Sequence, residues 1–347
     1  MKKLIFCFDG TCNSPEDVAD FYDDSSISNI LKLHVLFGGT LNEKTKNIAQ
    51  VPDQQSFYYS GIGNRGNWLV RAVNAAIAPV YWEMDDILRE ARADFNEHYN
   101  LGDQVYIFGF SRGAAIARMF AAHLTQPVKF LGVFDTVAAT RGSLDLNPDT
   151  FPSSGIVFEN DILGPHIERA LHILGLDERR LWLQPTLFNC DKRVTEVWFA
   201  GSHSDIGGGY WYDGLSDICL QFMIDNITDE LTVLAANELD YSLLKIPNSN
   251  DEITFDDIVV KPLVQGKIHG QFYTYGHSIT HAPRSVRVNH KEQASNHLPI
   301  IHKSVVKRFE QLVEYRPYAL RNVNYKIRGE NGCLSQQRLG ISGLSEE

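Results

Sequence analysis

The sequence lacks the cysteine arrangements that organise small secreted folds. Its five cysteines, Cys7, Cys12, Cys190, Cys219 and Cys333, are odd in number and widely scattered. The two nearest, Cys7 and Cys12, do not have the C-x-x-C spacing of a zinc or redox pair. This pattern disfavours a disulfide framework and a zinc site, and it favours synthesis in a reducing compartment.

Long hydrophobic runs are also missing. No stretch approaches the roughly 20 apolar residues that a membrane-spanning helix needs, so we expect membrane contact to be peripheral. The opening MKKLIFCFDG places two lysines before a short apolar run, as a signal peptide does. Asp9 ends that run too early for a signal peptide, and we therefore predict a first strand there and no signal peptide.

An excess of positive charge is the third absence. The 32 basic residues are outnumbered by 43 acidic ones, which gives a formal net charge of -11. This balance disfavours a general nucleic-acid surface, and we expect no nucleic-acid partner. A local basic group, Lys303, Lys307 and Arg308, can still meet anionic headgroups. With 44% apolar and 22% charged residues, the 347-residue chain otherwise has the composition of a globular protein with a large core.

Apolar runs alternate along the chain with segments of helical periodicity. Such alternation predicts an α/β fold, with a mostly parallel central sheet covered by helices on both faces. The ligands of such sheets bind at the carboxyl ends of the strands. The predicted strands are 3–8, 56–60, 105–108, the run ending at Asp135 and the run before Asp205, and the predicted helices are 27–37, 68–99 with a break at Pro79, and 114–120.

Three regions depart from this alternation. Residues 142–188 contain the stretch NPDTFPSSG and a predicted helix near 162–174, and we interpret them as a lid or cap insertion, with surface elaboration as the alternative. Residues 229–282 suggest a few short strands without showing how they pair. Residues 329–347 have the composition of a loosely held tail. We therefore predict a single domain over residues 1–328 followed by that tail.

The stretch VYIFGFSRGAAIARMF sets a serine between two glycines where an apolar strand gives way to a helix. Gly109, Ser111 and Gly113 have the G-x-S-x-G spacing of a nucleophile elbow, a sharp turn that holds a serine oxygen outward at the start of a helix. The alternative is a tight strand-to-helix turn in which the glycines serve only the backbone geometry.

A nucleophilic serine needs a base and an acid to orient that base. In α/β hydrolases these follow in the chain order serine, acid, histidine, and Ser111, Asp205 and His302 fit that order. Asp135 is the competing acid, because it also lies at a strand end after the elbow. His203 lies two residues before Asp205. The remaining late histidines, His277, His281, His290 and His297, are further candidates for the base.

The segment FDGTCN offers backbone donors for an oxyanion. We expect N–H groups of Gly10 and Thr11, together with that of Arg112 after the serine, to form an oxyanion hole. Asp9 is interpreted as a turn former or a metal ligand. The same segment half matches the D-x-D-G-T loop of haloacid-dehalogenase phosphatases, but Cys7 occupies the position of the first aspartate.

The loop SDIGGGY permits a second interpretation. His203 and Asp205, at positions i and i+2, have side chains that can share a cation. Three consecutive glycines instead favour a close approach of the backbone to the site. We expect neither a metal nor a cofactor, because a serine triad activates its nucleophile by proton transfer.

Several separated segments, read together, resemble the α/β-hydrolase family that includes the catalytic domains of type VI secretion phospholipase effectors, formerly a domain of unknown function. The resemblance covers about residues 3–322. Its most specific part is GFSRGA followed by SHSDIGGGY. The segments that carry it are FDGTCN, YYSGIG, GFSRGAAIAR, GVFDTV, VWFAGSHSDIGGGY with LSDICLQFMID, and IHKSVVKRFEQLVEYRPYAL.

The resemblance implies a serine esterase in which Ser111 is the nucleophile, Asp205 the acid and His302 the base, acting on phospholipid esters through an acyl-enzyme. It also implies an immunity or regulatory protein as partner and delivery by a secretion system. The alternatives are a soluble small-molecule esterase or thioesterase, a toxin or defence hydrolase controlled by a partner protein, and a binding module without turnover. Trp68, Trp211 and Tyr212 are candidates for an acyl groove or for core packing.

Overall fold

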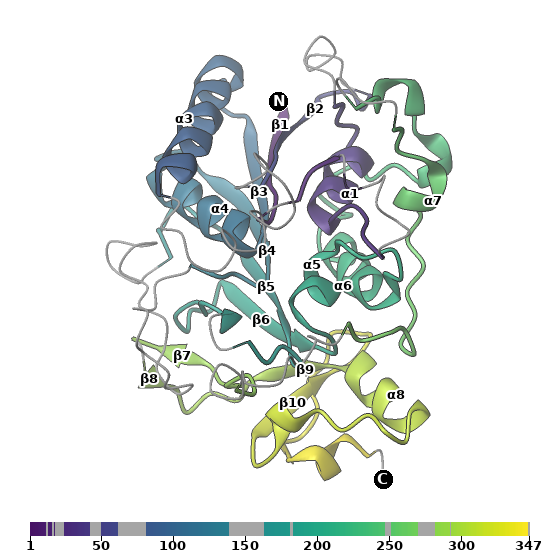
Figure 1. Ribbon diagram of the computed structural model, residues 1–347. Coiled ribbons are helices and arrows are strands. Elements are labelled where there is room, and N and C mark those ends of the chain that lie inside the picture. The colour runs from purple at the N-terminus through teal and green to yellow at the C-terminus, as the bar shows by residue number, and fades with distance from the viewer. Residues whose placement is uncertain are drawn as a thin grey trace.

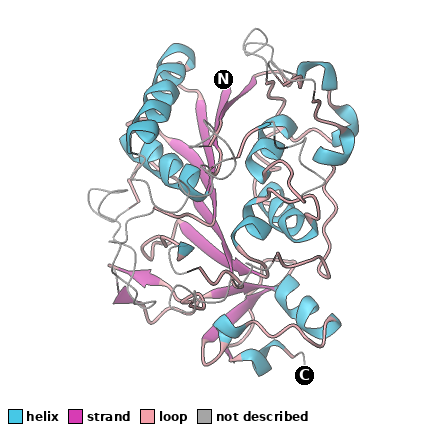
Figure 2. Ribbon diagram, viewed as in Figure 1, coloured by secondary structure: helices cyan, strands magenta, loops and turns pink. Residues whose placement is uncertain are grey.

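The computed structural model describes residues 1–11, 13–15, 17, 24–41, 50–61, 81–138, 163–180, 183–246, 251–269, 282–291 and 293–345, except for the side chains of 81–83. The described strands form one nine-stranded sheet and a separate pair, β7 and β8. Helices lie on both faces of the large sheet (Figures 1 and 2). The predicted α/β class is therefore confirmed.

The nine strands follow the order β11-β10-β9-β6-β5-β4-β3-β1-β2. All neighbours in this order are parallel except β10 and β11. The strands are β1 (Lys3–Phe8), β2 (Gln54–Tyr59), β3 (Gln104–Phe110), β4 (Val128–Phe134), β5 (Ala170–Gly175), β6 (Val194–Phe199), β7 (Asn289–His290), β8 (Gln293–Ala294), β9 (Ile300–His302), β10 (Asn324–Arg328) and β11 (Arg338–Leu339).

The helices divide between the two faces of the sheet. Helices α3 and α4 lie on one face, and α1, α5 and α6 lie on the other (Figure 1). The helices are α1 (Asn29–Leu36), α3 (Tyr81–His98), α4 (Ser111–His123), α5 (His203–Gly207), α6 (Gly214–Asp225), α7 (Phe255–Ile258) and α8 (Lys303–Gln311). None of these helices is long and apolar enough to cross a bilayer.

Strand β1 shows why the apolar runs are continuous. Leu4, Phe6 and Phe8 pack into the core beneath α3 and α4. Ile5 and Cys7 pack into the core beneath α1 and α6. Because successive side chains of a strand point to opposite faces, a strand covered on both sides needs apolar residues at every position.

The segment predicted as a helix near 162–174 is instead partly a strand. Residues 170–175 form β5, which lies between β4 and β6 and is fully buried. The run ALHILG has the same apolar character in a buried strand and in a buried helix, and periodicity does not separate the two. The described end of the predicted 142–188 insertion thus belongs to the central sheet, while 142–162 lies outside the described residues.

The C-terminal residues predicted as a loose tail include a short strand and one buried side chain. Strand β11 pairs with β10, and the side chain of Leu344 is fully buried. The basic group predicted to meet anionic headgroups, Lys303, Lys307 and Arg308, instead contacts other parts of the protein. Arg308 is buried and donates to the carbonyls of Val264 and Gly266, while Lys307 pairs with Glu330.

The carboxyl ends of four strands place the polar residues of the predicted motifs together. Asp9 follows β1, Ser111 follows β3, Asp135 follows β4, and the segment leading to Asp205 follows β6. Within the sheet these strands occur in the order β6-β5-β4-β3-β1, so only β5 separates members of the group. The predicted common edge is confirmed.

Candidate active site

Ser111 stands at a sharp turn between β3 and α4. Its φ of 56° lies in the left-handed region that few residues other than glycine adopt. A Cβ on Gly113 would lie 2.2 Å from the carbonyl oxygen of Asp9, and one on Gly109 would lie 2.7 Å from Cα of Ala114. The two glycines therefore let α4 pack closely against the ends of β1 and β3. This is the geometry predicted from the G-x-S-x-G spacing.

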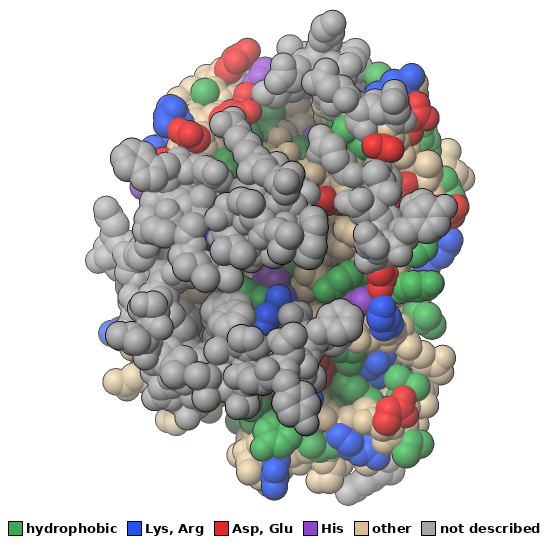
Figure 3. Space-filling model, in the orientation of Figure 1, with side chains coloured by type: hydrophobic (Ala, Val, Ile, Leu, Met, Phe, Trp, Pro, Cys, Tyr) green, Lys and Arg blue, Asp and Glu red, His purple; other side chains and the backbone are tan. Residues whose placement is uncertain are grey.

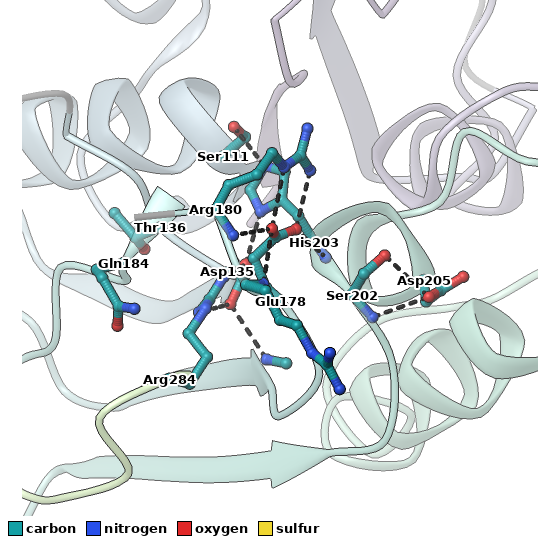
Figure 4. A network of polar contacts seen from close by, with 12 residues as sticks. Ser111, Asp135, Thr136, Glu178, Arg180, Gln184, Ser202, His203, Asp205 and Arg284 are labelled. Atoms are coloured by element: carbon teal, nitrogen blue, oxygen red, sulfur yellow. Dashed lines mark hydrogen bonds and ion pairs between the residues drawn. The ribbon is translucent and has the colours of Figure 1, made fainter. Parts of the chain in front are cut away.

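The histidine that contacts Ser111 is His203. Its Nε2 lies 2.7 Å from Oγ of Ser111, and its Nδ1 lies 2.6 Å from Oδ2 of Asp135 (Figure 4). His203 is the first residue of the short helix α5. An Nδ1–H that donates to the carboxylate leaves Nε2 as the acceptor for the serine hydroxyl.

Asp135 is held from two further sides. Arg284 donates through Nη1 to Oδ1 at 2.9 Å and through Nη2 to Oδ2 at 2.7 Å, and both side chains are fully buried. The N–H of Gly175 donates to Oδ1 at 3.1 Å. Burial alone would raise the pKa of Asp135, but the charge of Arg284 and the hydrogen bond from His203 hold that pKa well below its usual range. The carboxylate therefore stays ionised.

The backbone after Asp135 is fixed by a second histidine. The N–H of Thr136 donates to Nε2 of His172 at 3.1 Å, and Nδ1 of His172 lies 2.8 Å from Oε1 of Glu196. The N–H of Val137 donates to the carbonyl oxygen of Ser111 at 3.2 Å. These contacts support the positive φ of 39° at Asp135 and join the turn of the acid to the turn of the serine.

Three consecutive N–H groups before and at His203 each donate to a different carboxylate. Gly201 donates to Asp177 at 2.8 Å and Ser202 donates to Asp205 at 2.8 Å. His203 donates to Glu178 at 3.2 Å. Hydrogen bonds that end on a carboxylate are stronger than bonds between neutral groups. They fix the direction in which the His203 side chain leaves the backbone.

Asp205 does not contact the histidine that reaches Ser111. Its carboxylate accepts from the N–H and the hydroxyl of Ser202, and Oδ1 lies 2.5 Å from Nδ1 of His269. Positions i and i+2 do not share a face of a helix, so His203 and Asp205 point in different directions from α5. The prediction that Asp205 is the acid is therefore wrong in geometry. The structure places Asp135, the competing candidate, in that position.

His302 also lies away from Ser111. It ends β9 and caps α8, where its Nδ1 accepts from the N–H of Ser304 at 3.3 Å. Its ring stacks on Phe199 at 4.3 Å between centroids. Burial and the charge of Lys303 lower the pKa of His302 to about 3. The prediction that His302 is the base is wrong, because β6 and β5 separate β9 from the strands that carry Ser111 and Asp135.

Two of the three predicted oxyanion donors, Gly10 and Thr11, lie in the segment after β1, while Arg112 lies in α4. Gly10 donates its N–H to Oδ1 of Asp9 at 2.6 Å. Thr11 contacts the elbow, because its Oγ1 accepts from Nε of Arg112. The N–H of Gly10 therefore already has an acceptor, which disfavours it as an oxyanion donor.

Asp9 is a buried carboxyl at the end of β1. It accepts from the hydroxyls of Ser28 at 2.6 Å and Tyr58 at 2.7 Å, as well as from Gly10. Burial raises the pKa of Asp9 to about 6, against the opposing effect of these hydrogen bonds. Among the described residues, no group of three histidine, cysteine, aspartate or glutamate side chains is arranged to hold a metal ion.

A glutamate–arginine pair lies beside the histidine. Glu178 is buried, and its two oxygens accept from Nε and Nη2 of Arg180 at 2.9 and 2.8 Å. Burial alone would raise the pKa of Glu178, but the hydrogen bonds and charge of Arg180 hold it at about 2. On the face shown in Figure 3, basic and histidine side chains lie next to each other in a hollow of the surface.

The sequence held signals for most of this arrangement. Asp135 was a candidate because it ends a buried strand, and His203 was a candidate because it lies in the loop that contains Asp205. Arg284 was not predicted, since nothing in the surrounding sequence marks an arginine that binds a carboxylate from 149 positions away. The candidate histidines His277 and His281 and the aromatic Trp68 lie outside the described residues.

A serine, a histidine and an aspartate linked at the carboxyl edge of a mostly parallel sheet define an α/β hydrolase. The family model for the catalytic domain of Tle1-like phospholipase effectors of the type VI secretion system matches residues 2–127 and 122–226. These matches cover more than half of the chain, and the chain belongs to this family. The predicted family resemblance and hydrolase fold are therefore confirmed.

Individual proteins are similar to parts of the chain. The uncharacterized protein YEL023C of Saccharomyces cerevisiae is 30% identical over 136 residues, which are 36% of this chain and 17% of the yeast protein. An uncharacterized protein from Pseudomonas aeruginosa is 20% identical in its crystal structure, with a TM-score of 0.43 over 75% of this chain and 49% of that one. The Tle1 effector, in its structure bound to the VgrG spike of the type VI secretion system, is 26% identical, with a TM-score of 0.37 over 60% of this chain and 51% of that one.

These proteins are longer than the parts that match. The chain spans 17% of the yeast protein and about half of each of the two solved chains, 49% and 51%. The remaining residues of these proteins are not aligned with this chain.

Proposed function

We propose that the chain is a serine esterase that hydrolyses carboxylic esters of glycerophospholipids. The observation that carries the proposal is the continuous contact from Ser111 Oγ through His203 to Asp135, at 2.7 and 2.6 Å. This is the geometry that proton transfer from a serine requires. Membership of a phospholipase effector family supports phospholipid as the substrate class.

In the first half of the reaction, Oγ of Ser111 attacks the ester carbonyl carbon. His203 takes the hydroxyl proton on Nε2 and then gives it to the leaving alkoxide, so that an alcohol departs and the acyl group remains on the serine. Asp135 stabilises the imidazolium through its contact with Nδ1. Arg284 keeps Asp135 ionised and fixes its orientation.

In the second half, water attacks the acyl-serine. His203 again takes a proton, this time from the water, and returns it to Oγ as the carboxylic acid leaves. In both halves the backbone N–H groups of Arg112 and Thr11 are the proposed donors to the oxyanion. The N–H of Gly10 is left out of this role because it donates to Asp9.

Labelling and lipid hydrolysis test the proposal together. A fluorophosphonate probe is expected to label the wild type at Ser111, and mass spectrometry of lipids incubated with the protein is expected to show free fatty acid and lysophospholipid. Ser111→Ala is expected to lose both. Turnover of soluble short esters without any phospholipid hydrolysis would favour the small-molecule esterase, and labelling of another serine would remove the proposed nucleophile.

Family membership also supports a role as a delivered effector whose hydrolase is restrained by a cognate protein. The test is expression of the wild type and Ser111→Ala in the bacterial cytoplasm and, with an added signal sequence, in the periplasm. Growth arrest by the wild type alone, in one compartment, is the expected result. Equal growth of both strains in both compartments would contradict the effector role.

A further inference from the structure

The guanidinium group of Arg180 forms hydrogen bonds to described residues along only one of its edges. Its Nε donates to Oε1 of Glu178 at 2.9 Å and its Nη2 donates to Oε2 at 2.8 Å, while its N–H donates to Oε1 at 2.8 Å. The Glu178 side chain is fully buried, and that of Arg180 is 25% exposed. The glutamate thus orients the guanidinium from within, and the arginine reaches the surface.

This guanidinium lies beside the proposed base. The same oxygen of Glu178 that accepts from Nη2 of Arg180 also accepts from the N–H of His203, at 3.2 Å. Figure 4 shows Arg180 bound to Glu178 in the same network of polar contacts as His203 and Ser111. The carboxylate of Glu178 thus joins this positive charge to the backbone of the residue whose side chain contacts Ser111.

The two arginines of this network differ in how much of the guanidinium is occupied. Arg284 uses both Nη atoms on Asp135, and its side chain is fully buried. The contacts of Arg180 with described residues use Nε and Nη2 but not Nη1. One edge of Arg180 therefore keeps N–H donors that no described side chain or backbone group satisfies.

We infer that Arg180 binds the anionic phosphodiester of a glycerophospholipid while the acyl ester lies at Ser111. An oriented guanidinium presents parallel N–H donors that match two phosphate oxygens, and it remains charged at any relevant pH. In a glycerophospholipid only a short glycerol segment separates the phosphate from the acyl ester, so neighbouring sites bind the two groups. This inference rests on the proposed esterase function and specifies its substrate class.

Paired substrates with one acyl chain length test the inference. Arg180→Gln is expected to lower kcat/KM for dihexanoyl phosphatidylcholine about 10- to 100-fold, the size of one hydrogen bond to a charged group. For uncharged dihexanoylglycerol, the change is expected to stay within about 3-fold, because that substrate has no phosphate to lose. An equal loss on both substrates would overturn the inference and leave the esterase function intact.

Two variants control for charge and for folding. Arg180→Lys keeps the charge but loses the forked donors, so an intermediate loss on the phospholipid alone is expected. Arg169 precedes β5, whereas Arg180 follows that strand, and Arg169 pairs with Glu230. Arg169→Gln is expected to change kcat/KM for neither substrate. Thermal melts of all three variants show whether each is folded. Should Arg180→Gln not fold, a selective loss in Arg180→Lys still supports the inference, and no selective loss contradicts it.

A binding measurement separates the inference from turnover. Calorimetric titration of Ser111→Ala with glycerophosphocholine is expected to show binding that Arg180→Gln abolishes in the same background. Binding of inorganic phosphate without glycerophosphocholine would assign the site to free phosphate, and binding of neither would overturn the inference. Failure of the esterase itself is recognised differently, by a wild type that neither takes up a fluorophosphonate nor hydrolyses dihexanoylglycerol.

Discussion

The described part of the molecule contains two buried aspartate–histidine pairs close together in the fold, and the histidine of one of them contacts a serine hydroxyl. Asp135 and His203 are 2.6 Å apart, and His203 continues to Ser111. Asp205 and His269 are 2.5 Å apart, but the other nitrogen of His269 lies 3.1 Å from Asp24. One imidazole thus links a carboxylate to a hydroxyl, and the other links two carboxylates.

The difference lies in what each histidine can do with a proton. A histidine between a carboxylate and a hydroxyl can take the hydroxyl proton and return it. A histidine between two carboxylates has no hydroxyl to activate. The Asp205–His269 pair instead ties residues 205, 269 and 24 together, and Tyr210 stacks on His269 at 3.7 Å between centroids. We therefore assign this second pair to holding the segments around α5 in place.

The largest effect is expected from removing His203, the histidine that contacts Ser111. His203→Gln should lower kcat by about 10⁶, as loss of the serine or histidine does in a serine hydrolase, and Ser111→Ala should do the same. His269→Gln should cost less than about 10-fold, since it touches no reacting atom. Steady-state kinetics on a soluble ester compares the three. A dead but folded His269→Gln enzyme would reverse the assignment of the two pairs.

The aspartates provide the next test. Asp135→Asn should lower kcat by about 10⁴, because an amide no longer fixes the imidazole tautomer or stabilises imidazolium. Asp205→Asn should instead weaken the contacts around Ser202 and His269. We therefore expect its main effect to be a lower melting temperature, with a smaller effect on kcat. Kinetics and thermal melts on the same preparations decide the matter. Near-normal turnover in Asp135→Asn would contradict the role given to that carboxylate.

Arg284→Gln should alter the dependence of stability on pH. Burial raises the pKa of Asp135, but Arg284 and the contact with His203 hold it well below the usual value near 4. A depressed pKa contributes stability that is present above the unfolded pKa and is lost as the pH falls through the folded one. The variant should therefore lose about 3 to 5 kcal/mol at pH 7, and less at acid pH.

Urea unfolding of wild type and Arg284→Gln at pH 7 and pH 3 measures this difference. A gap between the two proteins that is equal at both pH values would mean that Arg284 stabilises by packing and not by its charge on Asp135. Turnover by Arg284→Gln is expected to fall about 10- to 100-fold. A loss of this size is typical when a residue that orients a functional side chain through hydrogen bonds is removed.

The smallest effect is expected at His302. His302→Ala removes the side chain that caps α8 and should cost about 1 kcal/mol of stability. Its kcat should stay within about 3-fold of the wild type, because β6 and β5 separate β9 from the strands that carry the site. A loss of activity as large as that of His203→Gln would restore His302 as the base.

The sequence was informative where a local pattern has one structural solution. The elbow at Ser111 was predicted because strand, glycine spacing and helix are contiguous, and the common edge followed from buried parallel strands. The histidine was predicted wrongly because chain order, and the place of His302 where an apolar segment meets a helix, favoured a late histidine. Only the course of β9 and α8, which depends on long-range pairing, shows that His302 stacks on Phe199 of β6 and does not reach Ser111.

The strand β5 and the arginines could not be predicted for a related reason. An apolar run such as ALHILG fits a buried helix and a buried strand equally well, and its pairing with β4 and β6 decides between them. Arg284 and Arg180 lie in polar segments where any arginine is expected at the surface. The roles of these two arginines depend on Asp135 and Glu178, the carboxylates that the fold places beside them.

The ring of Phe110 limits which amino-acid substitutions members of this family can accept during evolution. It ends β3, packs on the His203 ring at 4.8 Å, and occupies the space that a Cβ on Gly10 or Gly207 would enter, at 2.5 and 2.1 Å. One side chain thereby links its own motif to two others that are far away in the sequence. A substitution at any of these positions becomes tolerable only with a compensating change at another. We expect aligned relatives to show Phe110, Gly10 and Gly207 inherited as a set, with smaller rings at the first wherever a glycine at one of the others has been replaced.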